Sequence, residues 1–260
     1  MGKNDWMGPA ARVILPFTLL LVAACSSGGI DATIGEYPDK IYDQIVDNGN
    51  VIPAADTGVN GLNPQFARRE VSTPSNIPAE PAGTIVVDTP NRYLYLVQAN
   101  GKSIRYGIGV GREGFGWAGE ATIRAKQAWP TWTPPPEMLA RDPDSRPYAN
   151  GMPGGIDNPL GARAMYLFVG DRDTLYRIHG TTEAWSIGQA VSSGCVRMLD
   201  QDVIDLYNRV PLGTKVVVMG DPALMRSSGA TASATPPAGE VLFPPVAPKT
   251  AQPSPKVGPA

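Results

Sequence analysis

The sequence predicts a mainly β domain with little helix, flanked by disordered terminal segments. Short runs rich in β-branched and aromatic residues recur between turn residues from position 84 to 110, which is the pattern of antiparallel hairpins. Similar runs follow at 164–169, 175–178 and 215–219. Residues 200–210, by contrast, place apolar side chains at the spacing of an α-helix. The expected domain therefore contains several strands and one clear helix.

The first strands are expected to pair as successive hairpins. Residues 84–88 and 92–97 flank a turn at Pro90–Asn91, and Asn100–Gly101 then leads into residues 103–110. Pro, Asn and Gly are the residues that tight turns between strands prefer. Neighbouring runs are therefore expected to lie side by side in a sheet.

The helix is expected near the end of the domain. Asp200 is the predicted N-cap, because its carboxylate can accept a hydrogen bond from a free backbone amide of the first turn. Pro211 and Gly213 are expected to end the helix. The apolar residues at helical spacing are Val203, Leu206, Tyr207 and Val210.

Composition divides the chain into four parts. Residues 1–25 are expected to be a signal peptide, and residues 83–220 contain the expected strands and helix and are expected to form the folded domain. Residues 26–82 mix Gly, Asn, Pro and Asp with few periodic apolar positions, which predicts a largely unfolded tether with one short helix near 39–46. Residues 221–260 are rich in Ala, Pro, Ser and Thr and are expected to be disordered, because they cannot bury enough apolar surface.

The signal peptide has features of a lipoprotein precursor. Two basic residues precede the apolar run 13–22, and two alanines precede Cys25. The run is short for a permanent membrane span. Its ending resembles the bacterial lipoprotein signal, which would leave Cys25 as a lipid-modified first residue; the alternative is a plain signal peptide cleaved near Ala24. We expect export to the periplasm and a lipid anchor, with Ser26 favouring the outer membrane.

Charge and motif content argue against several classes of function. The formal net charge is −2 and there is no dense Lys/Arg cluster, so nucleic acid is not expected as a partner. Residues 109–114 have the glycine spacing of a dinucleotide fingerprint, but residues 115–119 are poor material for the helix which that motif requires. One His and one free Cys cannot readily build a tetrahedral zinc site. We expect no metal and no cofactor.

The chain contains two cysteines, Cys25 and Cys195. Lipidation of Cys25 would leave Cys195 without a partner for a disulfide. An unpaired thiol in an exported protein is exposed to oxidation, which suggests a reactive group. The alternative is a buried Cys that acts as a small apolar residue.

The neighbours of Cys195 favour the reactive alternative. His179 is the single histidine of the chain and lies at the end of a predicted strand. A Cys beside an imidazole loses its proton more readily than a free thiol, and the thiolate is the species that attacks carbonyls. Gly194 allows a tight turn whose amides can face an oxyanion, and Arg197 can recognise a carboxylate. Chemistry alone therefore favours a cysteine acyl-transfer enzyme over a structural Cys.

A longer pattern surrounds these residues. The run from His179-Gly-Thr through 186–188 to Ser192-Ser-Gly-Cys-Val-Arg-Met198 resembles the signature of the bacterial L,D-transpeptidase catalytic domain. Asp202, Leu206, Tyr207 and Gly213 behind this run fit the same signature, as do the upstream segments 84–88, 94–96, 106–111, 129–136 and 158–161. The resemblance covers about half of the chain.

The resemblance implies a β sandwich and a reaction. In this family the Cys attacks the bond before the terminal D-alanine of a stem tetrapeptide, at the L-centre of diaminopimelate, and D-alanine leaves. A side-chain amine of a second stem then resolves the thioester and makes a cross-link. By position, Cys195 would be the nucleophile, His179 the base and the Gly180 carbonyl the group that orients the imidazole. The amides of Gly194 and Cys195 would form the oxyanion hole.

The resemblance also assigns a substrate region. Ser192 would position the cysteine loop, and Arg197 would hold or shape the substrate site. Ser193 stands where many members of the family have His, and a Ser hydroxyl can hydrogen-bond but cannot act as a base near pH 7. The aromatic residues expected to line the cleft are Trp185, Tyr166 and Trp132.

Other functions share these residues. If water resolves the thioester, the protein is an L,D-carboxypeptidase; if an amine of an envelope protein does so, it attaches that protein to the wall. A different class is a non-catalytic peptidoglycan-binding lipoprotein. The intact pair of His179 and Cys195 argues against this last alternative.

Overall fold

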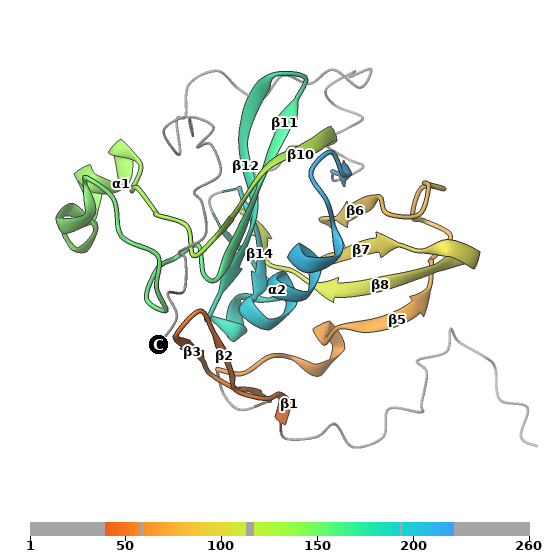
Figure 1. Cartoon of the computed structure of the whole chain (residues 1–260), viewed down its shortest axis with the longest axis horizontal. Coiled ribbons are helices and arrows are strands. Elements are labelled where there is room, and N and C mark those ends of the chain that lie inside the picture. Colours follow the sequence, from red (N-terminus) through yellow and green to blue (C-terminus); the bar gives the residue numbers. More distant parts are fainter. Residues whose placement is uncertain (1–39, 58–59, 113–116, 193, 221–260) are drawn as a thin grey trace, which may run out of the picture. The chain divides into compact units, whose positions relative to one another are not determined.

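Nine strands of the described residues form one mixed sheet (Figure 1). The computed structural model describes residues 40–57, 60–112, 117–192 and 194–220. The signal peptide, Cys25, Ser193 and the C-terminal tail lie outside these ranges. In spatial order the strands are β14 (Val196–Leu199), β12 (Arg172–Thr181), β11 (Arg163–Val169), β10 (Gly119–Ala128), β15 (Lys215–Met219), β6 (Ile85–Asp88), β7 (Tyr93–Val97), β8 (Lys102–Gly107) and β5 (Arg69–Ser72).

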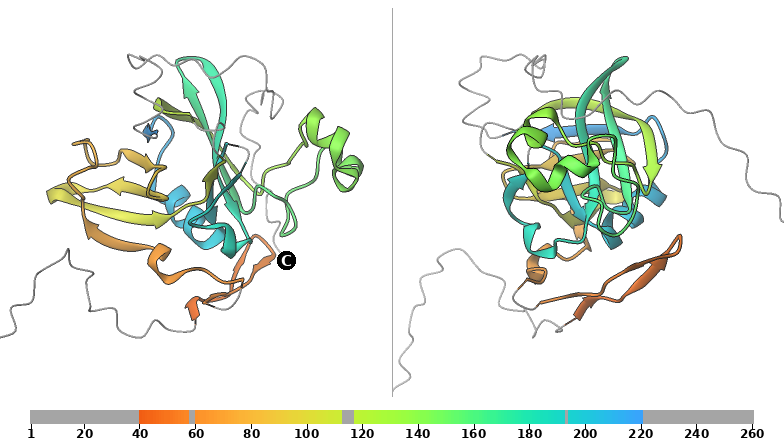
Figure 2. Two further views of the ribbon diagram at one scale, coloured as in Figure 1. Left: turned by 180° about the vertical axis from the view of Figure 1, so that it is seen from behind. Right: turned by 90° about the vertical axis from the view of Figure 1, so that its left-hand side faces the viewer.

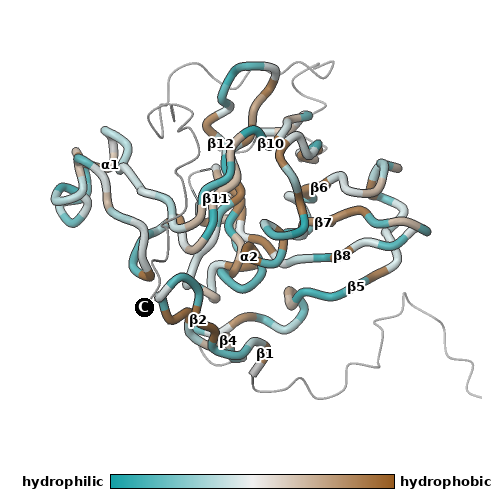
Figure 3. Tube along the Cα trace, in the orientation of Figure 1, coloured by the Kyte–Doolittle hydropathy of each residue, from teal (hydrophilic) through white to brown (hydrophobic). Residues whose placement is uncertain are grey.

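Most neighbours in this sheet are antiparallel, but β12 with β14 and β15 with β6 are parallel. Strands β10–β12 and strands β5–β8 run in different directions in Figure 1. Their inner faces contribute to one apolar core, in which α2 (Asp200–Arg209) also packs. Core residues from the two parts of the sheet include Ile85, Leu94, Ile104, Ile123, Met165, Leu167 and Ile178. Figure 3 shows how hydrophobic and hydrophilic residues are interspersed along these strands.

The prediction of a mainly β domain is confirmed, and so are the expected strands, except that residues 103–110 divide between β8 and the separate strand β9 (Val110–Gly111). Residues 84–97 form β6 and β7, and the runs near 164–169 and 175–178 lie in β11 and β12. The expected helix is α2, but the predicted N-cap is wrong. Leu199 is the N-cap and makes no side-chain cap bond. Asp200 is instead buried, and its carboxylate accepts a hydrogen bond from the Ala162 amide at 2.8 Å.

Two described regions of the domain were not anticipated from the sequence. The long central strand β10 was not anticipated, although residues 120–126 alternate between polar and apolar residues as a half-buried strand does. Residues 129–162 leave the sheet between β10 and β11 and contain α1 (Pro136–Arg141) and η3 (Pro143–Tyr148). The base of this excursion is closed by a hydrogen bond from the Trp129 amide to the Ala162 carbonyl.

The expectation of an unfolded tether is wrong for residues 40–72. β1 (Lys40–Tyr42) pairs with β4 (Ala55–Asp56), and β2 (Ile45–Asp47) pairs with β3 (Asn50–Ile52), where a short helix was expected. Strand β5 extends the main sheet at the free edge of β8. Figure 2 shows strands β1–β4 along one side of the main sheet. The buried apolar residues here are Ile52, Ala55, Leu62 and Phe66, which pack against other parts of the domain, whereas Val46 and Val51 are exposed.

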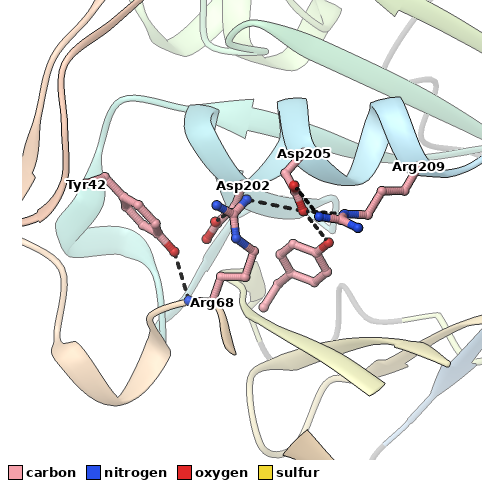
Figure 4. Close-up of polar contacts among 6 residues, drawn as sticks. Tyr42, Arg68, Asp202, Asp205 and Arg209 are labelled. Carbon is pink, nitrogen blue, oxygen red and sulfur yellow. Dashed lines mark hydrogen bonds and ion pairs between the residues drawn. The ribbon is translucent and has the colours of Figure 1, made fainter. Parts of the chain in front are cut away.

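Two contacts fix this N-terminal segment, defined as residues 40–72. Phe66 of η1 (Pro64–Phe66) packs with Ile187 and Leu199 in a second apolar cluster. Arg68 forms ion pairs with Asp202 and Asp205 of α2, at 3.6 and 3.2 Å (Figure 4). The segment is therefore a docked part of the domain. No helix within the described ranges has the length and apolar character needed to cross a membrane.

Candidate active site

The parallel pairing of β12 with β14 brings the predicted nucleophile and base together. Ile178 lies opposite Val196, and His179 lies opposite Arg197. Ile178 and Val196 both face the main core. Because side chains alternate along a strand, His179 and Arg197 face the other side of the sheet. Cys195 immediately precedes β14, so if the same alternation extends to it, its side chain is expected on the face of His179.

The imidazole of His179 is held in one tautomer. Its Nδ1 lies 2.8 Å from the Gly180 carbonyl oxygen. A carbonyl oxygen only accepts, so Nδ1 carries the proton and Nε2 keeps a free lone pair. Gly180 is itself fixed, since its amide donates to the Leu160 carbonyl at 3.0 Å and a Cβ at this position would lie 2.0 Å from an Asp200 oxygen. His179 thus presents a basic nitrogen with a defined direction.

Burial disfavours the charged forms of both His179 and Cys195. Burial, together with the charges of Arg197 and Arg177, lowers the pKa of His179 to about 4, against the opposing effect of the Gly180 hydrogen bond. Burial raises the pKa of Cys195, and the charge and backbone amide of Arg177 oppose this rise. These shifts do not favour a thiolate stabilised by imidazolium in the resting site. A neutral His179 is instead suited to accept the thiol proton.

The loop before Cys195 is held by Ser192. The Ser192 hydroxyl donates to the Cys195 carbonyl at 2.7 Å and accepts a hydrogen bond from the Gly194 amide at 3.3 Å. Gly194 has a φ of +123°, a conformation that L side chains rarely adopt. The loop conformation therefore depends on both Ser192 and Gly194.

The glycine-rich segment supports this loop from the other side. Val110–Gly111 form β9, which pairs in parallel with β13 (Ala190–Ser192). Gly109 and Arg197 exchange two backbone hydrogen bonds of 2.9 Å. The segment thus holds strands near the thiol, and its described part contains a strand where a dinucleotide fingerprint requires a helix.

Arg197 points toward the crossover between β12 and β14. Its Nη1 donates to the Glu183 carboxylate at 2.8 Å, and Glu183 is half exposed. The Nε of Arg197 is buried and finds no hydrogen-bond partner among the residues that the structure describes. Trp185 of η4 (Ala184–Ser186) is 46% exposed in the same crossover. This arrangement offers a cation and an aromatic side chain beside the thiol strand.

Residues 82–218 match the L,D-transpeptidase catalytic domain family, which is more than half of the chain. The chain belongs to this family. A probable L,D-transpeptidase, ErfK/SrfK, of Escherichia coli is 35% identical over 146 residues, which cover 53% of this chain and 44% of the relative. The chain thus spans less than half the length of that relative.

Two further proteins are similar to this L,D-transpeptidase family member. A putative L,D-transpeptidase of Fuscovulum blasticum is 34% identical over 142 residues, which cover 52% of this chain and 68% of the relative. A crystal structure from Brucella melitensis, described as a probable carnitine operon oxidoreductase, is 50% identical and covers 60% of this chain and 96% of its own, with a TM-score of 0.41.

The two other aromatic residues expected in the cleft are buried. Tyr166 is 6% exposed; its hydroxyl donates to Gln127 at 3.0 Å, and the Arg177 guanidinium lies 4.5 Å from the centre of its ring. Trp132 is 8% exposed and lies in the excursion, where its backbone exchanges two hydrogen bonds with the backbone of Met152. Both side chains pack within the L,D-transpeptidase domain, whereas Trp185 is open to solvent.

Sequence reasoning missed two residues of this L,D-transpeptidase site. Arg177 stands two positions before His179 and therefore on the same face of β12. The two-residue period of a strand is a sequence signal that could have identified it. Glu183, the partner of Arg197, lies in an irregular crossover and carried no sequence signal. Within the described ranges, no group of three or more His, Cys, Asp or Glu side chains is placed to hold a metal.

Proposed function

We propose that the protein is a peptidoglycan L,D-transpeptidase in which Cys195 is the nucleophile and His179 the general base. The observation that supports this proposal is the parallel β12–β14 pairing, in which the strand of His179 lies beside the strand that follows Cys195, with the imidazole oriented by the Gly180 carbonyl. Membership in the L,D-transpeptidase family supports the substrate class, a stem peptide that ends in D-alanine.

Acylation begins from the neutral pair. The thiol proton of Cys195 moves to Nε2 of His179 as sulfur attacks the carbonyl carbon of the L-centre of diaminopimelate. The bond to the D-alanine nitrogen then breaks, and the imidazolium returns the proton to that leaving amine. The products of this half-reaction are a Cys195 thioester, free D-alanine and a neutral His179.

The second half-reaction uses the same groups in reverse. The side-chain amine of a second stem attacks the thioester, His179 accepts its proton, and the sulfur leaves and is protonated again. The Cys195 amide stabilises the oxyanion in both steps. The Gly194 amide also donates to the oxyanion, and it gives up its long 3.3 Å hydrogen bond to the Ser192 hydroxyl to do so. The product is an amide cross-link between two third-position residues.

The remaining assignments concern substrate and location. Arg197 binds a substrate carboxylate through the exposed end of its guanidinium, and Trp185 packs against the peptide from the exposed crossover. We place the catalytic unit at residues 83–220, preceded by the docked N-terminal segment. Residues 1–25 act as a lipoprotein signal peptide, and Cys25 carries the anchor at the periplasmic face of the outer membrane.

The test is to incubate the purified protein with disaccharide tetrapeptides and analyse the products by mass. We expect loss of D-alanine and a cross-linked dimer, both absent with Cys195→Ser. Tripeptide without dimer would identify an L,D-carboxypeptidase. Transfer only to an added protein amine would identify an enzyme that attaches proteins to the wall. No turnover, with a thiol no more reactive than in denatured protein, would indicate a non-catalytic binding lipoprotein.

A further inference from the structure

Arg177 is the cross-strand neighbour of the proposed nucleophile. Because Ile178 lies opposite Val196 in the parallel β12–β14 pair, the preceding residues Arg177 and Cys195 also lie side by side. The backbone amide and the charge of Arg177 both lower the pKa of the Cys195 thiol. Side-chain alternation places the Arg177 side chain on the face that carries His179, away from the main core. A permanent cation therefore lies next to the sulfur.

The guanidinium is fixed in this position. The Arg177 side chain is 2% exposed and forms two hydrogen bonds to the Asp173 carboxylate, at 2.6 and 2.8 Å. Its Nη1 also donates to the Tyr176 carbonyl at 3.0 Å, and its flat face covers the Tyr166 ring. A buried Arg held by a bidentate carboxylate has little freedom to turn away. Its charge thus remains near the sulfur throughout the reaction.

We propose that Arg177 is a positioning residue that acts through Cys195, because its buried guanidinium stabilises the negative charge that the sulfur carries once its proton has left. The inference rests on the proposed function in one respect, that Cys195 is the nucleophile. The same charge disfavours a second cation nearby, so it also keeps the imidazole of His179 neutral and able to accept a proton.

Asp173 limits this effect. The charged groups that act on Cys195 are Arg177 and Arg197, which favour the thiolate, and Asp173, which opposes it. Arg197 is neutralised by Glu183 at its exposed end. Arg177 and Asp173 should therefore influence the sulfur in opposite directions, although both belong to one ion pair. If the ion pair were purely structural, the loss of either partner would disturb the site in the same way, and the two losses would not shift the thiol pKa in opposite directions.

The experiment measures the rate of Cys195 alkylation by iodoacetamide from pH 6 to 10, with labelling at Cys195 read by peptide mass. The full-length protein is compared with Arg177→Met, Arg177→Lys and Asp173→Asn. Arg172→Met is the matched control, because Arg172 is an exposed cation on the same strand. Iodoacetamide is uncharged, so surface charge does not steer it.

Arg177→Met should move the midpoint of the pH profile upward by about one unit, a roughly tenfold loss of rate below the midpoint. Arg177→Lys should recover most of this loss. Asp173→Asn should move the midpoint downward, and Arg172→Met should leave it unchanged. Equal midpoints in all variants, or shifts of Arg177→Met and Asp173→Asn in the same direction, would overturn the proposal. If Arg177→Met does not fold, the alkylation profiles of Arg177→Lys and Asp173→Asn still show in which direction the midpoint moves.

This readout is independent of peptide turnover. Absence of cross-linked product from the unmodified protein would contradict the proposed function and leave the alkylation profiles interpretable. An unchanged alkylation midpoint in Arg177→Met, with normal cross-linking by the unmodified protein, would contradict only the role of Arg177.

Discussion

Replacing Phe66 by Ala should loosen both the N-terminal segment and the crossover that leads to Cys195. Phe66 is 8% exposed, and its ring lies 5.3 Å from that of Tyr93. It also packs on Ile187, and a Cβ at Gly188 would lie 2.1 Å from its ring. The side chain thus fills the space directly beneath the crossover.

The expected loss of stability follows from this burial. Transfer of a buried Phe side chain contributes about 2 kcal/mol, and the cavity left beside Ile187 adds to this loss, so that Phe66→Ala should lower the free energy of unfolding by about 3 to 5 kcal/mol. For a domain of this size each kcal/mol corresponds to about 2–4 °C in melting temperature. A decrease of roughly 10 °C is therefore expected.

The assay is urea unfolding followed by circular dichroism, combined with KM and kcat for the proposed reaction. The matched control is Val46→Ala in the same segment, because Val46 is 68% exposed and its truncation should change stability by less than about 0.5 kcal/mol. The KM of Phe66→Ala should rise, since Trp185 and Glu183 lie in the crossover that Phe66 supports. A loss below about 1 kcal/mol, equal to that of Val46→Ala, would refute the docking of this segment.

Four other predictions address charge, mechanism and anchoring. Burial raises the pKa of Asp202 to about 7 and that of Asp200 to about 6, so the folded protein binds more protons than the unfolded chain between pH 4 and 7. Stability should thus be greatest at low pH within this window and fall as pH rises to 8; urea titrations should show a smaller fall for Asp202→Asn, and an equal fall would contradict the assignment. His179→Ala should slow acylation by about 10²–10⁴ near neutral pH, with partial recovery in alkali. The midpoint pH of Cys195 alkylation should not rise in His179→Ala, because the imidazole that this variant loses is already neutral. A clear rise in the measured midpoint would instead support a Cys195 thiolate that is stabilised by a His179 imidazolium. A carbapenem should add one mass per chain at Cys195 and little to Cys195→Ser, whereas Arg197→Ala should react more slowly; intact mass spectra with equal labelling of the Ser variant would exclude Cys195 as the nucleophile. Cys25→Ala should shift the protein from membrane to soluble fractions, and retention in the membrane fraction would indicate a different anchor.

The sequence revealed those features that depend on local pattern. Strands β6, β7, β11 and β15 were predicted because β-branched and aromatic residues cluster between turn residues. His179 and Cys195 were chosen because both residue types are rare in this chain. The N-terminal segment was missed because its burial comes from contact with residues distant in sequence, such as Ile187 and Asp202. No local period reports such contacts.

The resting protonation of the site also required the structure. Proximity of an imidazole to a thiol suggested an ion pair, but the outcome depends on how much water the fold removes from both groups. His179 and Cys195 are both buried, and two arginines lie near the imidazole. Burial therefore disfavours the charged form of each group, an effect that residue identity alone does not determine.

The distance in sequence between His179 and Cys195 has a topological cause. Parallel neighbours cannot be joined by a tight turn and need a crossover of about a dozen residues or more, here residues 182–195 between β12 and β14. This obligatory crossover is where Glu183 and Trp185 lie, so the connection that makes the pairing possible also carries the proposed substrate contacts. Because Phe66 packs beneath it, the N-terminal segment is coupled to the substrate side of the site through the same connection. Stability of the segment and affinity for substrate should therefore change together.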